Sequence, residues 1–240
     1  RESMRAIVMA GGEGCRLRPF PAVIPKPLAP LGDRSILEIV LRQLKRDGVE
    51  RVTLAVGYQA ELIMAVIGDG SKFGLEIDYS FEETPLGTIG PLAEIKGLNE
   101  TFLVMNGDVL TDMRYDDLVT FHKQRGGVAT IAAHQEVEEI SLGVLECNEA
   151  GRLVGFHEKP RFEYTVSMGV YVFEPQVLEF ITSGTSIGLD RLMARLLEVD
   201  LPVYTYPFNG YWIDIGRFDD FSVAMELFEK HKDRFLGGAT

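Results

Sequence analysis

The 240-residue sequence has little cysteine and no long apolar run. Its two cysteines, Cys15 and Cys147, are too few for a disulfide framework and lack the spacing of a zinc site, so we expect both to be reduced. No stretch approaches the roughly 18 apolar residues that cross a bilayer. No basic segment followed by an apolar run marks a secretory leader. These absences predict a cytoplasmic protein without a membrane partner.

The sequence also lacks an excess of basic residues. It has 24 lysines and arginines against 36 aspartates and glutamates, which gives a formal net charge of −12 at pH 7. Proteins that bind nucleic acid normally carry a basic surface that neutralises phosphates, so we exclude nucleic acid as a partner. Residues 1–26, however, hold five basic and two acidic side chains. A small phosphate ligand would therefore be bound near this segment.

Internal repeats, low-complexity tracts and Pro- or Gly-rich linkers are absent. The length and the 46% apolar content suit one well-cored domain, which we expect to span residues 1–240. Within it, residues 1–3 precede Met4, which we take as the natural start of the chain.

Apolar runs of strand length alternate with segments of helical spacing, a pattern typical of a mostly parallel sheet flanked by helices. A buried strand over 5–10 ends in glycines. Ser35 and Glu38 form a capping box that begins a helix over 35–45. Further elements are predicted as strands over 51–56, 75–81 and 101–105, and as helices over 60–67 and 115–123. The sequence thus predicts an α/β, Rossmann-like fold with a mixed, mostly parallel sheet.

The second half of the sequence is richer in strands, which we expect over 128–133, 142–147, 152–157 and 166–173. Antiparallel or mixed pairing of these strands would cover the end of the sheet. Two helices, over 189–198 and 219–232, follow. The second is amphipathic, and we expect it to pack on its own sheet because helices of small domains bury their apolar face internally.

A glycine-rich loop over residues 10–19 follows the first strand. It holds three glycines and two arginines. Glycine lets backbone N–H groups approach phosphate oxygens, and arginine adds fixed donors. The loop is not a Walker A motif, because no Gly-Lys-Ser/Thr ends it, and Leu17 replaces the third glycine of the dinucleotide motif. By itself the loop predicts either a triphosphate site or a turn with solvated arginines.

Six short motifs follow one another along nearly the whole chain. They are the loop with Pro25-Lys26-Pro27-Leu28, residues 82–88, Asn106-Gly107-Asp108, Glu158-Lys159-Pro160, residues 167–171 and residues 212–216. Together they resemble the signature of the sugar-1-phosphate nucleotidyltransferases. The resemblance implies the nucleotide-diphospho-sugar transferase fold, with residues 1–240 as a catalytic domain.

The resemblance also implies a reaction, in which a sugar 1-phosphate oxygen attacks the α-phosphorus of a nucleoside triphosphate without a covalent intermediate. An anionic nucleophile needs no catalytic serine, cysteine or histidine, so positioning and charge neutralisation can carry the rate. By the resemblance, Arg16 and Lys26 neutralise the triphosphate, while the catalytic Asp108 and Asp214 hold Mg²⁺, which prefers one or two carboxylates. Solvated cations and turn or capping aspartates are the alternatives.

The nucleotide, by the same resemblance, lies against Gly11, Gly12, Gly14, Glu82 and Gly87. Glu82 stands where the family often has a glutamine that contacts the base. A carboxylate accepts two hydrogen bonds, which suits the N1–H and N2 amino donors of guanine better than the edges of uracil, thymine or cytosine. We therefore expect GTP to be the favoured nucleotide.

The sugar 1-phosphate, by the resemblance, lies against Gly143, Glu158, Lys159 and Ser167. Lys159 would contact the phosphate and Glu158 the sugar hydroxyls, although an exposed Glu-Lys pair is also common on protein surfaces. Ser167 replaces the asparagine usual in the family, and Cys15 replaces a threonine in the phosphate loop. Such departures predict an unusual sugar or cyclitol 1-phosphate, whose identity the sequence does not determine.

Two other interpretations stay open. One is a regulatory subunit of the same fold that binds a nucleotide or sugar nucleotide without catalysis, but the residues it would be expected to lose, Arg16, Asp108 and Asp214, are present. The other is the same chemistry with another triphosphate and a cyclitol phosphate. A monomer and a homodimer are both possible. Because the sequence ends soon after 212–216, we expect a catalytic domain without the β-helical extension of some relatives.

Overall fold

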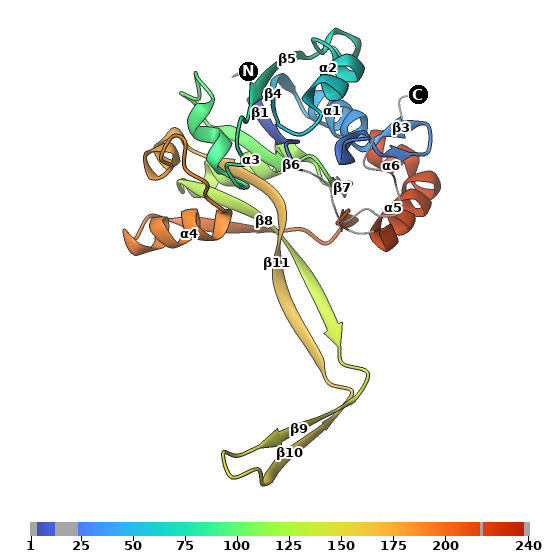
Figure 1. The fold of residues 1–240 in the computed structure, drawn as a ribbon, viewed down its shortest axis with the longest axis vertical. Coiled ribbons are helices and arrows are strands. Elements are labelled where there is room, and N and C mark those ends of the chain that lie inside the picture. Colours follow the sequence, from blue (N-terminus) through green and yellow to red (C-terminus); the bar gives the residue numbers. More distant parts are fainter. Residues whose placement is uncertain (1–3, 13–23, 217, 238–240) are drawn as a thin grey trace.

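The computed structural model describes residues 4–12, 24–216 and 218–237 (Figure 1). At its centre lies a seven-stranded sheet of described strands, in the spatial order β12 (Val203–Pro207), β8 (Ala129–Glu139), β11 (Arg161–Phe173), β6 (Phe102–Asn106), β1 (Met4–Met9), β4 (Val49–Val56) and β5 (Glu76–Phe81). Neighbouring strands are parallel, except that β11 is antiparallel to both β8 and β6. The predicted α/β fold with a mixed, mostly parallel sheet is confirmed.

The strand order reverses at β1. From β1 the chain proceeds through β4 to β5 on one side, and then crosses to β6 on the other side of β1. In open α/β sheets such a switch point leaves a crevice at the carboxyl ends of the strands, where ligands bind. Met9 and Asn106, the last residues of β1 and β6, pair with each other at this edge.

Helices cover both faces of the sheet, which is why its central strands are apolar on both sides. Alternate residues of β1 show this: Ala6 and Val8 pack with Leu41 of α1, whereas Ile7 packs with Leu192 of α4. The α-helices are α1 (Ile36–Arg46), α2 (Ala60–Ile67), α3 (Tyr115–Arg125), α4 (Leu189–Glu198), α5 (Phe218–Lys230) and α6 (Lys232–Leu236), and the 3-10 helices are η1 (Lys26–Leu28), η2 (Ser71–Phe73), η3 (Gly90–Glu94) and η4 (Pro175–Phe180). None of the helices in the described ranges has the length and apolar character that crossing a bilayer requires.

The capping box at the start of α1 is confirmed. The Ser35 side chain accepts the Glu38 N–H at 3.2 Å, and the Glu38 carboxylate accepts the Ser35 N–H at 3.0 Å. Two unpaired donors of the first helical turn are satisfied in this way.

The predicted single C-terminal helix is two helices, α5 and α6, separated at His231. Their buried side chains, Phe221, Phe228 and Phe235, pack in one cluster with Ile36 and Ile39 of α1. The amphipathic C-terminal segment was expected to pack on its own sheet. It packs within its own chain, but on α1 and on the short strands Pro30–Leu31 and Trp212–Asp214 rather than on the main sheet.

Three short strand pairs complete the fold. They are β2 (Pro30–Leu31) with β3 (Arg34–Ser35), β7 (Val109–Thr111) with β13 (Trp212–Asp214), and β9 (Gly143–Cys147) with β10 (Leu153–Glu158). The β7–β13 pair lies at the carboxyl end of β6, and the β9–β10 pair lies far from the main sheet (Figure 1).

The expectation that the strand-rich second half covers the end of the sheet is wrong for residues 134–166, which we call the arm. Here β8 and β11 leave the sheet as a two-stranded ribbon, and the β9–β10 hairpin forms its outer end (Figure 1). The sequence predicted that the strand of β8 ends at residue 133 and that the strand of β11 begins at residue 166, because the neighbouring residues 134–139 and 161–165 are mostly polar. Backbone hydrogen bonds between two strands do not depend on apolar side chains, so the ladder continues.

Candidate functional site

A cavity of about 600 Å³ opens at the carboxyl ends of β1, β4 and β6. Its lining combines the end of the first strand, the loop after β5 and the turn after β6, and includes Gly11, Gly12, Glu82, Gly87, Asn106 and Asp108. The volume is within the range of small-molecule sites, and the position is where open α/β sheets bind ligands. Five of the residues predicted from the sequence thus line one cavity.

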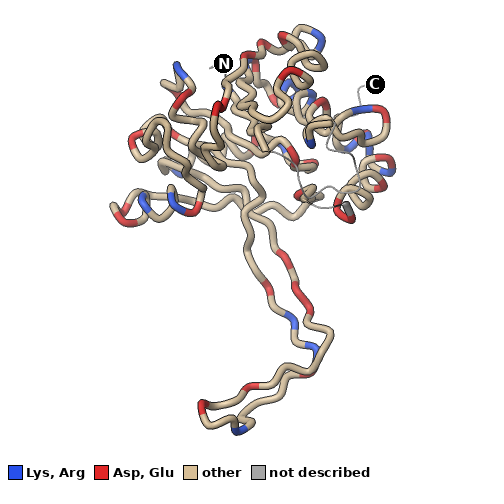
Figure 2. The backbone as a smooth tube through the Cα atoms, in the orientation of Figure 1, with Lys and Arg blue, Asp and Glu red and all other residues tan. Residues whose placement is uncertain are grey.

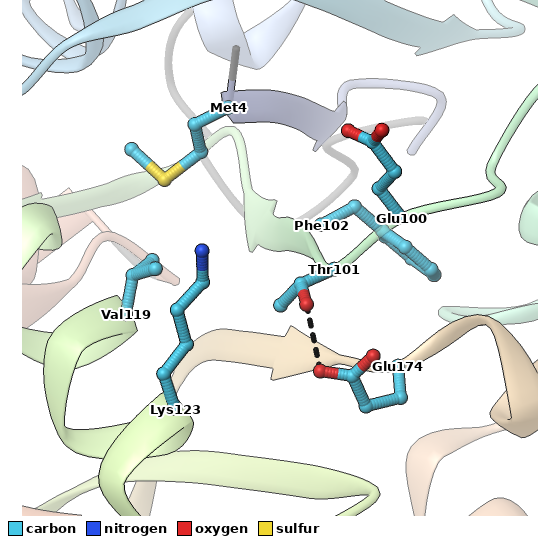
Figure 3. Close-up of a pocket in the computed structure, with 7 residues that line it drawn as sticks. All are labelled: Met4, Glu100, Thr101, Phe102, Val119, Lys123 and Glu174. Carbon is cyan, nitrogen blue, oxygen red and sulfur yellow. Dashed lines mark hydrogen bonds between the residues drawn. The ribbon is translucent and has the colours of Figure 1, made fainter. Parts of the chain in front are cut away.

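A second cavity, of about 240 Å³, lies at the opposite ends of the same strands (Figure 3). Met4 and Phe102, the first residues of β1 and β6, line it with Glu174, whose carboxylate accepts the Thr101 hydroxyl at 2.7 Å. No residue predicted to be functional lies there. We therefore take the cavity at the carboxyl ends as the candidate site.

Gly11 and Glu82 meet at the wall of this cavity. A Cβ on Gly11 would lie 2.5 Å from Glu82 Oε1, so a side chain at position 11 would displace the carboxylate. The other oxygen, Oε2, accepts the Leu86 N–H at 3.1 Å and closes the loop after β5. Burial raises the pKa of Glu82, and the bond from Leu86 opposes this in part. Glu82 is therefore fixed between the two loops expected to bind the nucleotide.

Gly87 holds the second of these loops in place. Its φ is +76°, and a Cβ there would lie 2.6 Å from the Ile187 carbonyl oxygen. The Ile187 N–H in turn donates to the Leu86 carbonyl at 2.9 Å. The close backbone approach that glycine permits thus ties the loop to the segment that precedes α4.

Asp108 and Asp214, more than a hundred positions apart in the sequence, are brought together by the pairing of β7 with β13. Asp214 ends β13 and pairs with Val109 of β7, and the Ile215 N–H donates to the Asp108 carbonyl at 3.0 Å. Burial raises the pKa of Tyr171, and the charges of Asp214 and Asp108 raise it further. Both carboxylates are therefore close to one tyrosine hydroxyl.

The Lys26 ammonium forms an ion pair with the Asp108 carboxylate, and both side chains are largely buried. Lys26 begins η1, where Pro25 and Pro27 on either side restrict the backbone. In the structure this lysine contacts Asp108, which lines the cavity. Arg16 and Gly14 lie outside the described residues.

The residues present fit a divalent cation. Two carboxylates, one in the turn after β6 and one at the end of β13, match Mg²⁺, which takes one or two protein carboxylates and completes its shell with phosphate oxygens and water. The ion pair with Lys26 shows that Asp108 accepts a cation. Within the described ranges no group of three or more His, Cys, Asp or Glu side chains could hold a metal ion.

The residues predicted to bind the sugar phosphate are divided between two places. Ser167 lies at the base of the arm, where its hydroxyl contacts the Tyr171 hydroxyl at 3.4 Å, near the two aspartates. Gly143 and Glu158 pair with each other at the outer end of the arm, next to Lys159. We call these three residues the elbow, because Lys159 has a φ of +44° where the ribbon bends into the β9–β10 hairpin.

The two places are well separated. Ser167 is six positions after Arg161 in β11, a distance of about 20 Å along an extended strand at ~3.3 Å per residue. Figure 1 shows the arm projecting away from the sheet. In this chain, therefore, the elbow and the cavity do not come together.

Two site residues were missed by the sequence analysis. Tyr171 lies next to both aspartates. The Trp212 indole N–H donates to the Met168 carbonyl at 2.9 Å and so holds the base of the arm against β13. Tyr171 belongs to the motif 167–171 and Trp212 to the motif 212–216, so these motifs could have pointed to both residues. The motifs alone do not say what either residue does.

Comparison with known proteins agrees with this geometry. A family model described as nucleotidyl transferase matches residues 5–231. A UTP–glucose-1-phosphate uridylyltransferase of Synechocystis sp. is 34% identical over 242 residues, covering 92% of this chain and 62% of that protein. A mannose-1-phosphate guanylyltransferase catalytic subunit beta of Drosophila pseudoobscura pseudoobscura is 37% identical, covering 93% of this chain and 62% of that protein.

The fold also matches a solved structure, described as a putative glucose-1-phosphate thymidylyltransferase from Bacillus anthracis in complex with a sucrose. The TM-score is 0.75 at 19% identity, and the match covers 94% of this chain and 95% of that one. The chain spans about 62–64% of the length of the curated relatives it matches. Because the family model and these relatives match over nine-tenths of the chain, it belongs to the sugar-1-phosphate nucleotidyltransferase family.

Proposed function

We propose that the chain transfers a nucleoside monophosphate from a nucleoside triphosphate, with GTP favoured, to a sugar or cyclitol 1-phosphate, releasing pyrophosphate. The observation that carries the proposal is the position of Asp108, which lines a cavity together with Gly11, Gly12 and the loop after β5. There it forms an ion pair with Lys26, and the pairing of β7 with β13 brings Asp214 beside it. Residues 1–240 would form the catalytic domain, and a cytoplasmic location remains a prediction from the sequence.

In the proposed reaction an oxygen of the sugar phosphate attacks the α-phosphorus, a new P–O bond forms, and the bond to the departing pyrophosphate breaks. The nucleophile is already an anion, so the chain needs no general base. Gly11 and Gly12 let the backbone approach the triphosphate, and Lys26, with Arg16, neutralises its charge. Asp108 and Asp214 would hold Mg²⁺. When bound, the ion neutralises charge on the phosphates and orients them.

Glu82 supports the preference for guanine. One of its oxygens bonds to the Leu86 N–H, and a carboxylate has about four lone-pair sites, so further donors can be accepted. The names of the relatives support two candidate nucleotides. The mannose-1-phosphate guanylyltransferases among them support GTP. The second candidate is UTP, used with glucose 1-phosphate, as named for the uridylyltransferase of Synechocystis sp..

A substrate matrix tests the proposal. GTP, UTP, dTTP and CTP are each incubated with mannose, glucose and heptose 1-phosphates and a cyclitol 1-phosphate, in Mg²⁺, and pyrophosphate release is measured. We expect release that depends on both substrates, with GTP the best nucleotide. A tenfold advantage of UTP, dTTP or CTP would overturn the base preference, and no release with any pair would overturn the activity.

A further inference from the structure

The arm exposes large apolar side chains that isolated surface strands rarely carry. In the β9–β10 hairpin, Phe156 is directly opposite Leu145 and Leu153 is opposite Cys147, so these side chains share one face. The exposed fractions of Leu145, Leu153 and Phe156 are 59%, 54% and 58%. Contiguous apolar surface of this kind marks a contact site, and a two-stranded hairpin by itself is only marginally stable in water.

The same face ends at the elbow. Glu158 is two residues beyond Phe156, on the same side of the strand, and Gly143 is opposite it. Glu158 and Lys159 are exposed, and within the described ranges neither has an ion-pair partner. The residues of the family motif therefore stand at the edge of an apolar face that no other described part of the chain covers.

The arm is held away from its own cavity by a continuous ladder. Cross-strand pairs run from Gln135 and Thr165, whose side chains are hydrogen-bonded at 2.8 Å, to Glu139 and Arg161, which form an ion pair at 2.7 Å. The Ile140 N–H extends the ladder by donating to the Pro160 carbonyl at 3.1 Å. To reach the cavity of the same chain, this ribbon would have to fold back on itself.

The charges of the elbow and the cavity are complementary. The described lining of the cavity contains the carboxylates of Glu82, Glu83 and Asp108 and no lysine or arginine. At the elbow, Lys159 is exposed and has no ion-pair partner within the described ranges, whereas the nearby Arg161 is paired with Glu139. Figure 2 shows basic positions near the bend of the arm and acidic positions along the rest of the ribbon. The unpaired Lys159 ammonium on the extended arm thus complements the carboxylates of a cavity that it does not reach in its own chain.

We propose that two copies of this chain exchange their arms, so that Glu158 and Lys159 of each copy complete the sugar-phosphate side of the other copy's cavity. This rests on the proposed function, because only a nucleotidyltransferase cavity has a use for these two residues. The occupant is a second copy because that molecule carries the matching cavity. In a two-fold dimer the exchange is reciprocal, and both apolar faces are covered without any change in the ladder.

Mixed dimers test the exchange. Differently tagged chains carrying Asp108→Asn and Lys159→Ala are co-expressed, and the dimer bearing both tags is purified. If the arms are exchanged, one site of each mixed dimer combines an intact cavity with an intact arm, so activity at low sugar 1-phosphate is about half that of the wild type. If each arm serves its own chain, both sites are defective and activity stays at the level of the single variants, which would overturn the proposal.

A mixed dimer with both substitutions on the same chain is the matched control. A chain with both Asp108→Asn and Lys159→Ala is paired with a wild-type chain. With exchanged arms each site has one defect, and the mixed dimer loses nearly all activity. A mixed dimer that keeps half of the activity would contradict the exchange.

A measurement independent of activity separates this inference from the proposed function. Residues 136–164 are replaced by Asn-Gly, a two-residue turn that suits the hydrogen-bonded pair Gln135 and Thr165. Sedimentation equilibrium should give a dimer for the wild type and a folded monomer for this variant. A wild-type monomer overturns the exchange whatever the enzyme assays show. A dimer that releases no pyrophosphate with any substrate pair overturns the proposed function instead.

Discussion

The body of the molecule and the arm are both built around β-strands, but they bury their side chains very differently. In the body, Ile7 of β1 and Val104 of β6 are fully buried between two layers of helices. In the arm, Leu145 and Phe156 are opposite each other on a strand pair, and among the described residues both side chains remain exposed. The body is stabilised by packing, whereas the arm is held mainly by its backbone ladder and by contacts that another molecule must supply.

The difference separates the two halves of the candidate site. The residues proposed to bind the nucleotide and the metal lie at or next to strand ends of the packed body, so their positions relative to one another are set within the chain. Glu158 and Lys159 belong to the arm, and their position relative to the nucleotide depends on where the arm docks. Substitutions in the body should therefore mainly lower kcat, and substitutions in the arm should mainly weaken the binding of the sugar 1-phosphate.

The largest effect is expected for Asp108→Asn in the body. Loss of a metal carboxylate should lower kcat by roughly 10²–10³, since charge neutralisation at the phosphates accounts for several kcal/mol of the barrier. Initial rates at saturating Mg²⁺ measure it, with an unchanged melting temperature as the control. Full turnover by this variant would remove Asp108 from the metal site.

Core and arm phenylalanines should differ in their effect on stability. Phe102 is buried against Phe173, with ring centroids 6.1 Å apart, and Phe102→Ala should lower the free energy of unfolding by about 3–5 kcal/mol. Phe156→Ala in the exposed arm should change it by no more than roughly 0.5 kcal/mol in dilute solution. Urea unfolding measures both values, and equal losses would contradict the contrast between body and arm.

Lys159→Ala should weaken sugar-phosphate binding selectively. A charged hydrogen bond contributes about 1.5–3 kcal/mol, so KM for the sugar 1-phosphate should rise roughly 10- to 100-fold while KM for the nucleotide is unchanged. The matched control is Arg152→Ala, an exposed basic residue at the far end of the same arm. Equal effects of the two variants would mean that the elbow has no specific role.

Glu82→Gln should reduce the preference for guanine about tenfold, because an amide offers one acceptor in place of two and one hydrogen bond is lost. Burial raises the pKa of Glu82, so the carboxylate takes up a proton at a higher pH than an ordinary glutamate. KM for GTP should therefore rise as the pH falls toward that range, and the glutamine variant should show no such rise. A pH-independent wild-type KM would exclude Glu82 from base binding.

The smallest effect is expected at a helix cap. Ser35→Ala removes the capping box of α1 and should lower the free energy of unfolding by about 1 kcal/mol. Ser141→Ala in the arm, an exposed serine, should change it by less than roughly 0.5 kcal/mol. Thermal unfolding compares the two, and a larger loss from the arm serine would contradict the assignment of stability to the body.

Much of the body could be predicted from the sequence because local rules determine it. The capping box of Ser35 and Glu38 fixed where α1 begins, and the helices over 60–67 and 189–198 were predicted with their observed bounds. Gly11, Glu82 and Asp108 each follow a predicted strand, and parallel strands bring their carboxyl ends to one edge of the sheet. The motifs identified the family without any knowledge of the coordinates.

The tertiary structure alone decided which of these residues meet. Asp214 reaches Asp108 through the pairing of β13 with β7, a contact between distant segments that no local pattern encodes. Lys26 contacts Asp108 because the packing of η1 against the body directs it there. The hairpin strands over 142–147 and 152–157 were predicted from the sequence, close to the observed β9 and β10. The extension of β8 and β11 into the arm was not, since the polar residues 134–139 lack the apolar periodicity that identifies strands, while a backbone ladder forms regardless of side-chain polarity. The sequence determined the chemistry that the residues can perform, and the long-range strand pairing determined where each of them lies.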